Sequence, residues 1–272
     1  VSREGRIEIL NESGNPSDSY PVDEDGSFGF SLIPYKDYDL RYVNDCMPDI
    51  NITQQLTAPC SDSSTVKMVL NIPAPAELNV FYLEKKNVPF FVTGYYLPNT
   101  SENLEALRLK FSYNLIGKTD STKYIEKPGP EYDNYAKVVD RVMKDAERFI
   151  LKKIDYLLGG CLTEGEELNI NVTGFADPRP ISKFGKYDGV EIDVPEFDLR
   201  ISRGAQMDNE LLSTLRAYFT AKELQSRIRR YDEYSSVSSR IKWSVSGSGV
   251  DKSEALSNDL KRRVSIEAGF DE

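Results

Sequence analysis

The 272-residue chain is long enough for two domains of ordinary size, and its 39% hydrophobic content is typical of chains with folded cores. Its net charge of -10 argues against binding to nucleic acid or to anionic lipid, because both reward a positive protein surface. No apolar run approaches the roughly 18 residues that a spanning helix needs, so we expect a soluble chain. The chain starts at Val1 without a basic segment followed by an apolar one, so any export signal or lipid anchor is expected outside these residues.

The sequence contains no histidine, and its three cysteines are Cys46, Cys60 and Cys161. Histidine is therefore excluded as a general base and as a metal ligand, and none of the cysteines belongs to a CxxC pair. Two alternatives stay open for Cys46 and Cys60: a disulfide in an oxidising compartment, or two free thiols. We predict a chain without a metal ion or a cofactor.

The first 74 residues are predicted to form a small β-sandwich without helices. Arg6–Leu10 and Ser27–Leu32 alternate between apolar and polar residues, which is typical of half-buried strands. Tyr38–Val43 and Val66–Ile72 have the composition of strands. Turn residues between these stretches, such as Asp25-Gly26, favour short connections.

A sequence motif in this segment resembles a known envelope module. The stretch Asp23-Glu-Asp-Gly26-Ser-Phe-Gly-Phe30, with Pro34 and Tyr38-Asp-Leu-Arg41 after it, is similar to the carboxypeptidase regulatory-like domain. That family is a transthyretin-like sandwich that serves as a spacer, so the resemblance implies no catalysis here. The stiff Ile72-Pro-Ala-Pro-Ala76 stretch predicts a domain boundary, with one domain at 1–74 and another at 75–272.

The second domain is predicted to be α+β, with strands and helices in the order β-α-α-β, an excursion, and then α-β-β. The predicted strands are Leu78–Leu83, Leu168–Thr173, Ile241–Val245 and Val264–Ala268. The predicted helices are one capped by Pro98–Ser101, then Tyr132–Leu158, and then Asn209–Ile228. A hairpin of Val190–Val194 and Phe197–Ser202 is expected within the excursion.

Four stretches of this domain, in the right order, resemble the OmpA C-terminal family, a module that binds peptidoglycan. Val88–Leu97, running into Ser101–Leu107, is similar to that family's opening strand and first helix. Val172-Thr-Gly174-Phe-Ala-Asp177 stands where the family has a Gly-His-Thr-Asp turn. The most specific match is the run from Asn209 to Ala217, which reproduces a Leu-Ser-x-x-Arg-Ala helix start, and Leu260–Ile266 resembles the closing strand.

The resemblance implies an OmpA-like β/α/β/α/β fold with insertions and a site for diaminopimelate, whose free end carries an ammonium and a carboxylate. At the matching positions, Asp177 accepts from the ammonium and Arg216 holds the carboxylate. The side chain of Asn209 and the backbone of Gly174, Phe175 and Ala176 are expected to support the ligand. The residue types alone also permit a simple Asp177–Arg216 ion pair.

Several positions depart from the family pattern. Phe175 and Ala176 replace two polar residues of the family turn, and the stretch 178–208 is longer than usual. Strand alternation places Arg262 and Arg263 on opposite faces, and we do not expect Arg262 to touch ligand. Tyr95 and Tyr96 are expected to be core residues or ordinary surface tyrosines, with a glycan-flanking role as the less favoured alternative.

The sequence therefore favours a non-catalytic protein of the periplasm, associated with the outer membrane, that tethers an outer-membrane protein assembly to peptidoglycan. The combination of domains resembles envelope proteins of the Bacteroidetes type. The alternative is a periplasmic interaction scaffold that has lost wall binding, which the changes at Phe175 and Ala176 favour. A hydrolase is disfavoured, because no pair of carboxylates stands at positions that predict convergence in one pocket.

Overall fold

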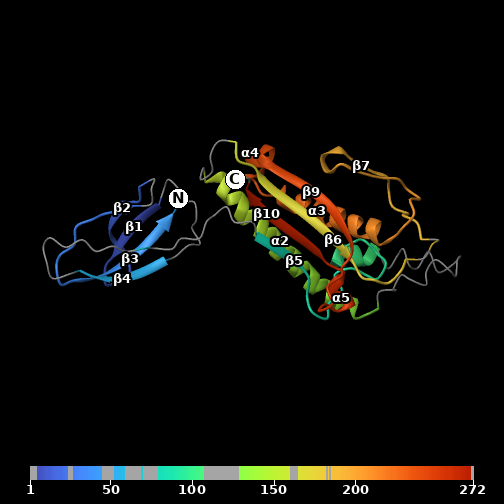
Figure 1. The fold of residues 1–272 in the computed structure, drawn as a ribbon, viewed down its shortest axis with the longest axis horizontal. Helices are drawn as coiled ribbons and strands as arrows, with labels where there is room; N and C mark the ends of the chain where they lie inside the picture. Colours follow the sequence, from blue (N-terminus) through green and yellow to red (C-terminus); the bar gives the residue numbers. More distant parts are fainter. Residues whose placement is uncertain are drawn as a thin grey trace. The chain divides into compact units, whose positions relative to one another are not determined.

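The computed structural model describes residues 5–23, 27–44, 52–58, 69, 79–106, 129–159, 165–181, 183 and 185–270 (Figure 1). The chain divides into two compact units, which are Val1–Glu77 with Asp155–Glu166, and Leu78–Ile154 with Glu167–Glu272. The first unit is rich in strands, and the second combines a mixed sheet with helices. This architecture confirms the predicted α+β class.

A four-stranded antiparallel sheet of order β2-β1-β3-β4 forms the first unit. Its strands are β1 (Gly5–Leu10), β2 (Pro16–Pro21), β3 (Asp37–Asn44) and β4 (Ile52–Thr57). Alternate residues of β1 and β3 point into one core, which includes Ile7, Ile9, Leu40 and Tyr42. Apolar residues therefore lie on the core face of these two strands at the period of two that the sequence predicts.

One strand predicted in the first unit does not form, and two others were not predicted. Residues of Ser27–Leu32 have no strand pairing, although Phe28 and Phe30 pack against the core. Their alternation correctly marks a core-facing side, but the backbone there lacks a neighbouring strand. The strands β2 and β4 were missed because their residues are mostly exposed and polar. Of the strand predicted at Val66–Ile72, the structure describes Val69 alone. The Asp25-Gly26 turn and the three cysteines lie outside the described residues.

The second unit is built on a sheet of order β5-β10-β6-β9. Its strands are β5 (Asn79–Leu83), β6 (Leu168–Ala176), β9 (Ile241–Val250) and β10 (Val264–Phe270). The strand β10 runs antiparallel to both β5 and β6, whereas β6 and β9 are parallel. All four strands overlap the stretches predicted from the sequence.

Two long helices cover the same face of this sheet. Helix α2 (Tyr132–Leu158) contacts β5 through Phe149, whose ring lies 5.6 Å from that of Phe81. Helix α3 (Asn209–Ile228) packs on β6 and β9 (Figure 1). Phe81, Ile266 and Val172 stand beside one another in register, so their side chains share a face, and this face also meets α3. The opposite face carries polar pairs such as Thr173–Ser246, whose hydroxyl oxygens lie 3.0 Å apart.

Shorter elements connect these layers. A helical segment at 101–106 follows the predicted cap. Val88–Leu97 forms turns and isolated bridges, so its match to an opening strand is wrong, and β5 is the strand that precedes this helix. The excursion contains the expected hairpin of β7 (Ile192–Val194) and β8 (Leu199–Ile201), joined by η1 (Pro195–Phe197).

Three short helices lie near the C-terminus: α4 (Tyr234–Val237), η2 (Ser238–Arg240) and α5 (Asn258–Lys261). Among the described residues, no helix has the length and apolar character to cross a membrane.

Candidate functional site

The candidate site lies where strand β6 ends beside the first turns of helix α3. Gly174 makes this approach possible, because a Cβ atom on it would lie 2.0 Å from the backbone oxygen of Ser213. At the start of the helix, the Asp208 side chain accepts a hydrogen bond of 2.7 Å from the Leu211 N–H. This cap fixes the first turn of α3. Asp177, the first residue after β6, and Arg216, in the second turn of α3, are therefore brought to the same end of the sheet.

The Asp177 carboxylate is 6% exposed and is held by two arginines. Its Oδ1 accepts from the backbone N–H of Arg179 at 3.0 Å and from the Arg179 Nε at 2.9 Å. Its Oδ2 accepts from Arg179 Nη2 at 2.7 Å and from Arg262 Nη1 at 3.3 Å. Burial alone raises the pKa of Asp177, but the hydrogen bonds from Arg179 and the charges of Arg179 and Arg262 outweigh it, so the pKa is lowered.

Arg262 is a buried anchor of the site, with 3% of its side chain exposed. Its Nη2 donates to Asp259 at 2.6 Å, and its Nη1 also donates to the Thr93 hydroxyl at 3.1 Å. The prediction that Arg262 and Arg263 diverge agrees with their contacts. Arg263 pairs with Glu84 and Asp251 and lies over the Tyr82 ring, away from the contacts of Arg262.

Arg216 is completely buried, and its hydrogen bonds go to backbone carbonyls rather than to a carboxylate. The Nε donates to the Tyr95 oxygen at 3.0 Å, and Nη1 donates to the Phe175 oxygen at 2.9 Å. The guanidinium carbon lies 4.9 Å from the centre of the Phe91 ring. Burial, with the positive charges of Arg262 and Arg179, lowers the pKa of Arg216 to about 9, so the group stays charged at neutral pH. Its Nη2 has no hydrogen-bond partner among the described residues.

The charges of this cluster do not balance. Among the described residues, Arg179 and Arg262 pair with the carboxylates of Asp177 and Asp259, whereas the third guanidinium, on Arg216, pairs with neither. Two of the three cations are almost fully buried, and a buried charge is costly unless it is paired. Within the described part of the chain, the Nη2 of Arg216 is thus a buried charged donor without an acceptor.

The structure places the other predicted site residues in this region with partners of their own. The Asn209 amide donates to the Arg179 oxygen at 3.2 Å, and the Ala176 oxygen accepts from the Asp251 N–H. The Phe175 N–H donates to the Arg263 oxygen, while its carbonyl accepts from Arg216. Gly174 serves the close packing of the helix. No ion pair joins Asp177 and Arg216 directly within the described part of the chain.

Arg179 and Thr93 contribute to the site, although neither was predicted from the sequence as a site residue. The Thr93 hydroxyl accepts from both Arg179 and Arg262. One local signal existed for Arg179. An Asp followed by Pro favours a turn in which the carboxylate accepts the N–H two residues on, and that residue is Arg179. Thr93 reaches the site only through the tertiary fold, so no local pattern marks it.

The stacked pair Tyr95 and Tyr96 is buried, with ring centres 4.5 Å apart. Tyr96 also stacks on Phe219 of helix α3 at 4.9 Å. Burial raises the pKa of Tyr95 to about 12. These tyrosines are core residues, which confirms the favoured interpretation, and the glycan-flanking alternative is wrong.

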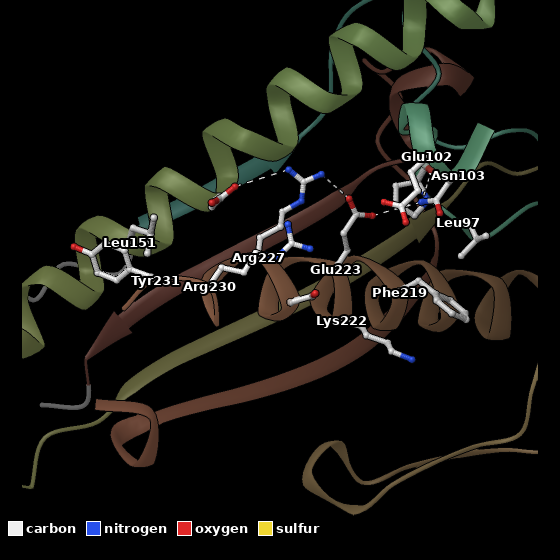
Figure 2. A pocket seen from close by; sticks show the side chains of 13 residues that line it. Leu97, Glu102, Asn103, Leu151, Phe219, Lys222, Glu223, Arg227, Arg230 and Tyr231 are labelled. Atoms are coloured by element: carbon white, nitrogen blue, oxygen red, sulfur yellow. Dashed lines mark hydrogen bonds and ion pairs between the residues drawn. The ribbon is translucent and has the colours of Figure 1, made fainter. Parts of the chain in front are cut away.

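A separate pocket of about 720 Å³ lies between helices α2 and α3 and the start of the 101–106 helix (Figure 2). Figure 2 shows Glu223 between Arg227 and Asn103, with Arg227 also paired to Glu147. Burial, together with the negative charge of Glu102, raises the pKa of Glu223, although Arg227 opposes the shift. Ion pairs within the wall thus compensate several of its charges. Leu97, Glu102 and Asn103 of this pocket belong to the first stretch that resembles the OmpA C-terminal family, but the sequence predicted no site there.

In the described ranges, no group of three or more acidic or cysteine residues could hold a metal ion. Comparisons with family models and with curated proteins gave no match. Among solved structures, the periplasmic domain of Helicobacter pylori MotB is similar at 19% identity, over 58% of this chain and 79% of that one, with a TM-score of 0.28. The similarity is distant, and the function proposed below depends on the residues of the site.

Proposed function

We propose that this protein is a non-catalytic protein of the periplasm that binds peptidoglycan through the diaminopimelate of its stem peptides. In this role it tethers an outer-membrane assembly to the cell wall. The observation that carries the proposal is the buried guanidinium of Arg216, with one donor lacking an acceptor, at the same strand end as Asp177. The four sequence stretches that resemble the OmpA C-terminal family point to the same two residues.

The chemistry of the ligand matches this arrangement. The free end of diaminopimelate carries an ammonium and a carboxylate on one carbon. A carboxylate that accepts from Arg216 Nη2 would supply the anion that the cluster lacks. The ammonium would then replace one of the cations at Asp177.

Binding rather than catalysis also fits the electrostatics of Asp177. Its pKa is lowered, so the carboxylate stays ionised at neutral pH. A general acid would need the opposite shift, toward the operating pH.

A calorimetric titration tests the proposal through the chemistry of the ligand. One ligand is a muropeptide whose stem contains diaminopimelate, and its counterpart contains lysine, which has the ammonium without the second carboxylate. We expect saturable binding of the first and binding weaker by about tenfold or more for the second, because a charge-assisted hydrogen bond is lost. Equal binding of the two muropeptides would show that Arg216 does not bind the carboxylate of diaminopimelate.

A second function, an interaction scaffold without wall binding, is favoured by a different observation. Both oxygens of Asp177 already have internal donors, and Arg216 is not exposed to solvent. The scaffold would be the function if the folded protein bound neither muropeptide. The pocket between α2 and α3 would then be the first surface to test for a partner.

A further inference from the structure

Arg179 belongs to the long stretch 178–208 and occupies the carboxylate that the proposed ligand needs. Its Nε and Nη2 meet the two oxygens of Asp177 at 2.9 and 2.7 Å, which is a bidentate pair. Its backbone N–H adds a third hydrogen bond to Oδ1. Proline on either side, at Pro178 and Pro180, restricts the backbone at this position. The contact is therefore built into the local chain rather than made by a distant flexible residue.

The two arginines at Asp177 differ in how readily they can leave. Arg262 is 3% exposed and is also held by Asp259 and Thr93. The Arg179 side chain is 45% exposed, and its guanidinium also donates to the Thr93 hydroxyl at 3.3 Å. Water and salt reach the half-exposed guanidinium of Arg179 and screen its charge more than that of the buried Arg262. A cationic ligand group that reaches Asp177 would displace Arg179 and leave Arg262 in place.

We propose that Arg179 is an internal competitor of the ligand: its guanidinium occupies Asp177 in the free protein and is displaced by the ligand ammonium. This inference rests on the proposed function and adds a regulatory residue to it. The cost of breaking the Asp177–Arg179 pair is subtracted from the binding free energy of every ligand that uses Asp177. Arg179 thus sets the affinity of the site without contacting the wall itself.

The test is a calorimetric titration of the diaminopimelate muropeptide into the parent protein, Arg179→Ala and Arg179→Lys. We expect Arg179→Ala to bind about fivefold more tightly. This factor corresponds to about 1 kcal/mol, the free energy of an ion pair with one half-exposed partner. Arg179→Lys keeps a charge but loses the bidentate geometry, so its affinity should lie between the two. Arg200→Ala is the matched control, since it removes the same charge from an exposed arginine of the same stretch, and it should bind like the parent.

A double variant identifies the carboxylate involved. In an Asp177→Asn background, the gain from Arg179→Ala should vanish, because the pair no longer exists. If Arg179→Ala bound no more tightly than a parent that binds, the role of Arg179 as a competitor would be contradicted and the proposed function would stand. Binding by Arg179→Ala but not by the folded parent would support the role of Arg179 as a competitor and would contradict wall binding as the function of the parent. The absence of binding by either folded protein would overturn the proposed function and the competitor together.

Discussion

Each unit of this protein contains a buried carboxylate held by two arginines, and the comparison separates a structural cluster from a candidate site. In the first unit, Glu8 is 7% exposed and pairs with Arg6 at 3.3 Å and Arg41 at 2.7 Å. In the second unit, Asp177 pairs with Arg179 and Arg262. In both, burial alone would raise the pKa, and the arginines reverse the shift and lower it.

The difference lies in what surrounds the two carboxylates. Arg6 lies two residues from Glu8 on the same strand, and Arg41 is its direct neighbour across the sheet. These arginines are 35% and 30% exposed, so water solvates their excess charge. The buried arginines beside Asp177 are Arg216 and Arg262, and each has one donor, Nη2 and Nε respectively, with no acceptor among the described residues. An unpaired buried charge is costly whereas a solvated one is not, and for this reason the ligand site is proposed at Asp177 rather than at Glu8.

The largest expected effect on stability tests how far the site depends on the close approach of strand β6 to helix α3. Gly174→Ala places a methyl group against the Ser213 backbone, and we expect it to lower the free energy of unfolding by about 3 kcal/mol. Gly29→Ala, in the first unit, is the control, because a Cβ there meets nothing within 4 Å. Trp243 is the only tryptophan and lies in β9, so its fluorescence reports unfolding of the second unit.

The two carboxylates can be neutralised in parallel to compare what they contribute to stability. Asp177→Asn leaves Arg262 buried beside one carboxylate instead of two, and we expect a loss of about 2 kcal/mol. Glu8→Gln should cost about 1 kcal/mol or less, since its arginines remain solvated. Denaturant unfolding measures both values by far-ultraviolet circular dichroism. A larger loss in Glu8→Gln would contradict the distinction between a buried and a solvated cluster.

The smallest effect is a dependence on pH. The pKa values of Asp177 and Glu8 are both lowered in the folded chain. Each group therefore stabilises the fold above its unfolded-state pKa, about 3.9 for Asp and 4.3 for Glu, and the contribution is lost as the pH falls through the folded value. We expect melting temperatures to fall below about pH 4, and to fall less steeply in either neutral variant. A parent curve that is flat down to pH 3 would contradict the lowered pKa values.

Much of the second unit could be predicted because its apolar residues follow regular periods. Leu168–Thr173 alternates strictly, and Tyr132–Leu158 keeps one apolar face, so strand β6 and helix α2 were found with nearly correct bounds. Polar strands such as β4 carry no such signal, because β4 is held in the sheet by backbone hydrogen bonds to β3 rather than by apolar side chains.

For the candidate site, the sequence indicated which residues would lie close together but not how their charges would pair. The resemblance placed Asp177 and Arg216 at one end of the sheet, where the structure also has them. It did not reveal that Arg179 would occupy Asp177, or that Arg216 would bond to two carbonyls. The carbonyl partners of Arg216 are set by how segments distant in sequence pack together, and local patterns do not encode that. The contact of Arg179 with Asp177 is local, and the Asp-Pro turn was its one signal in the sequence.

The most direct test of the account compares muropeptide binding by Asp177→Asn and Glu8→Gln. Each variant removes one buried carboxylate flanked by two arginines and alters the net charge equally. We predict that Asp177→Asn weakens binding of the diaminopimelate muropeptide by about tenfold to a hundredfold, while Glu8→Gln binds as the parent does. Equal binding by the two variants, with both folded, would contradict the assignment of the Asp177 cluster as the ligand site.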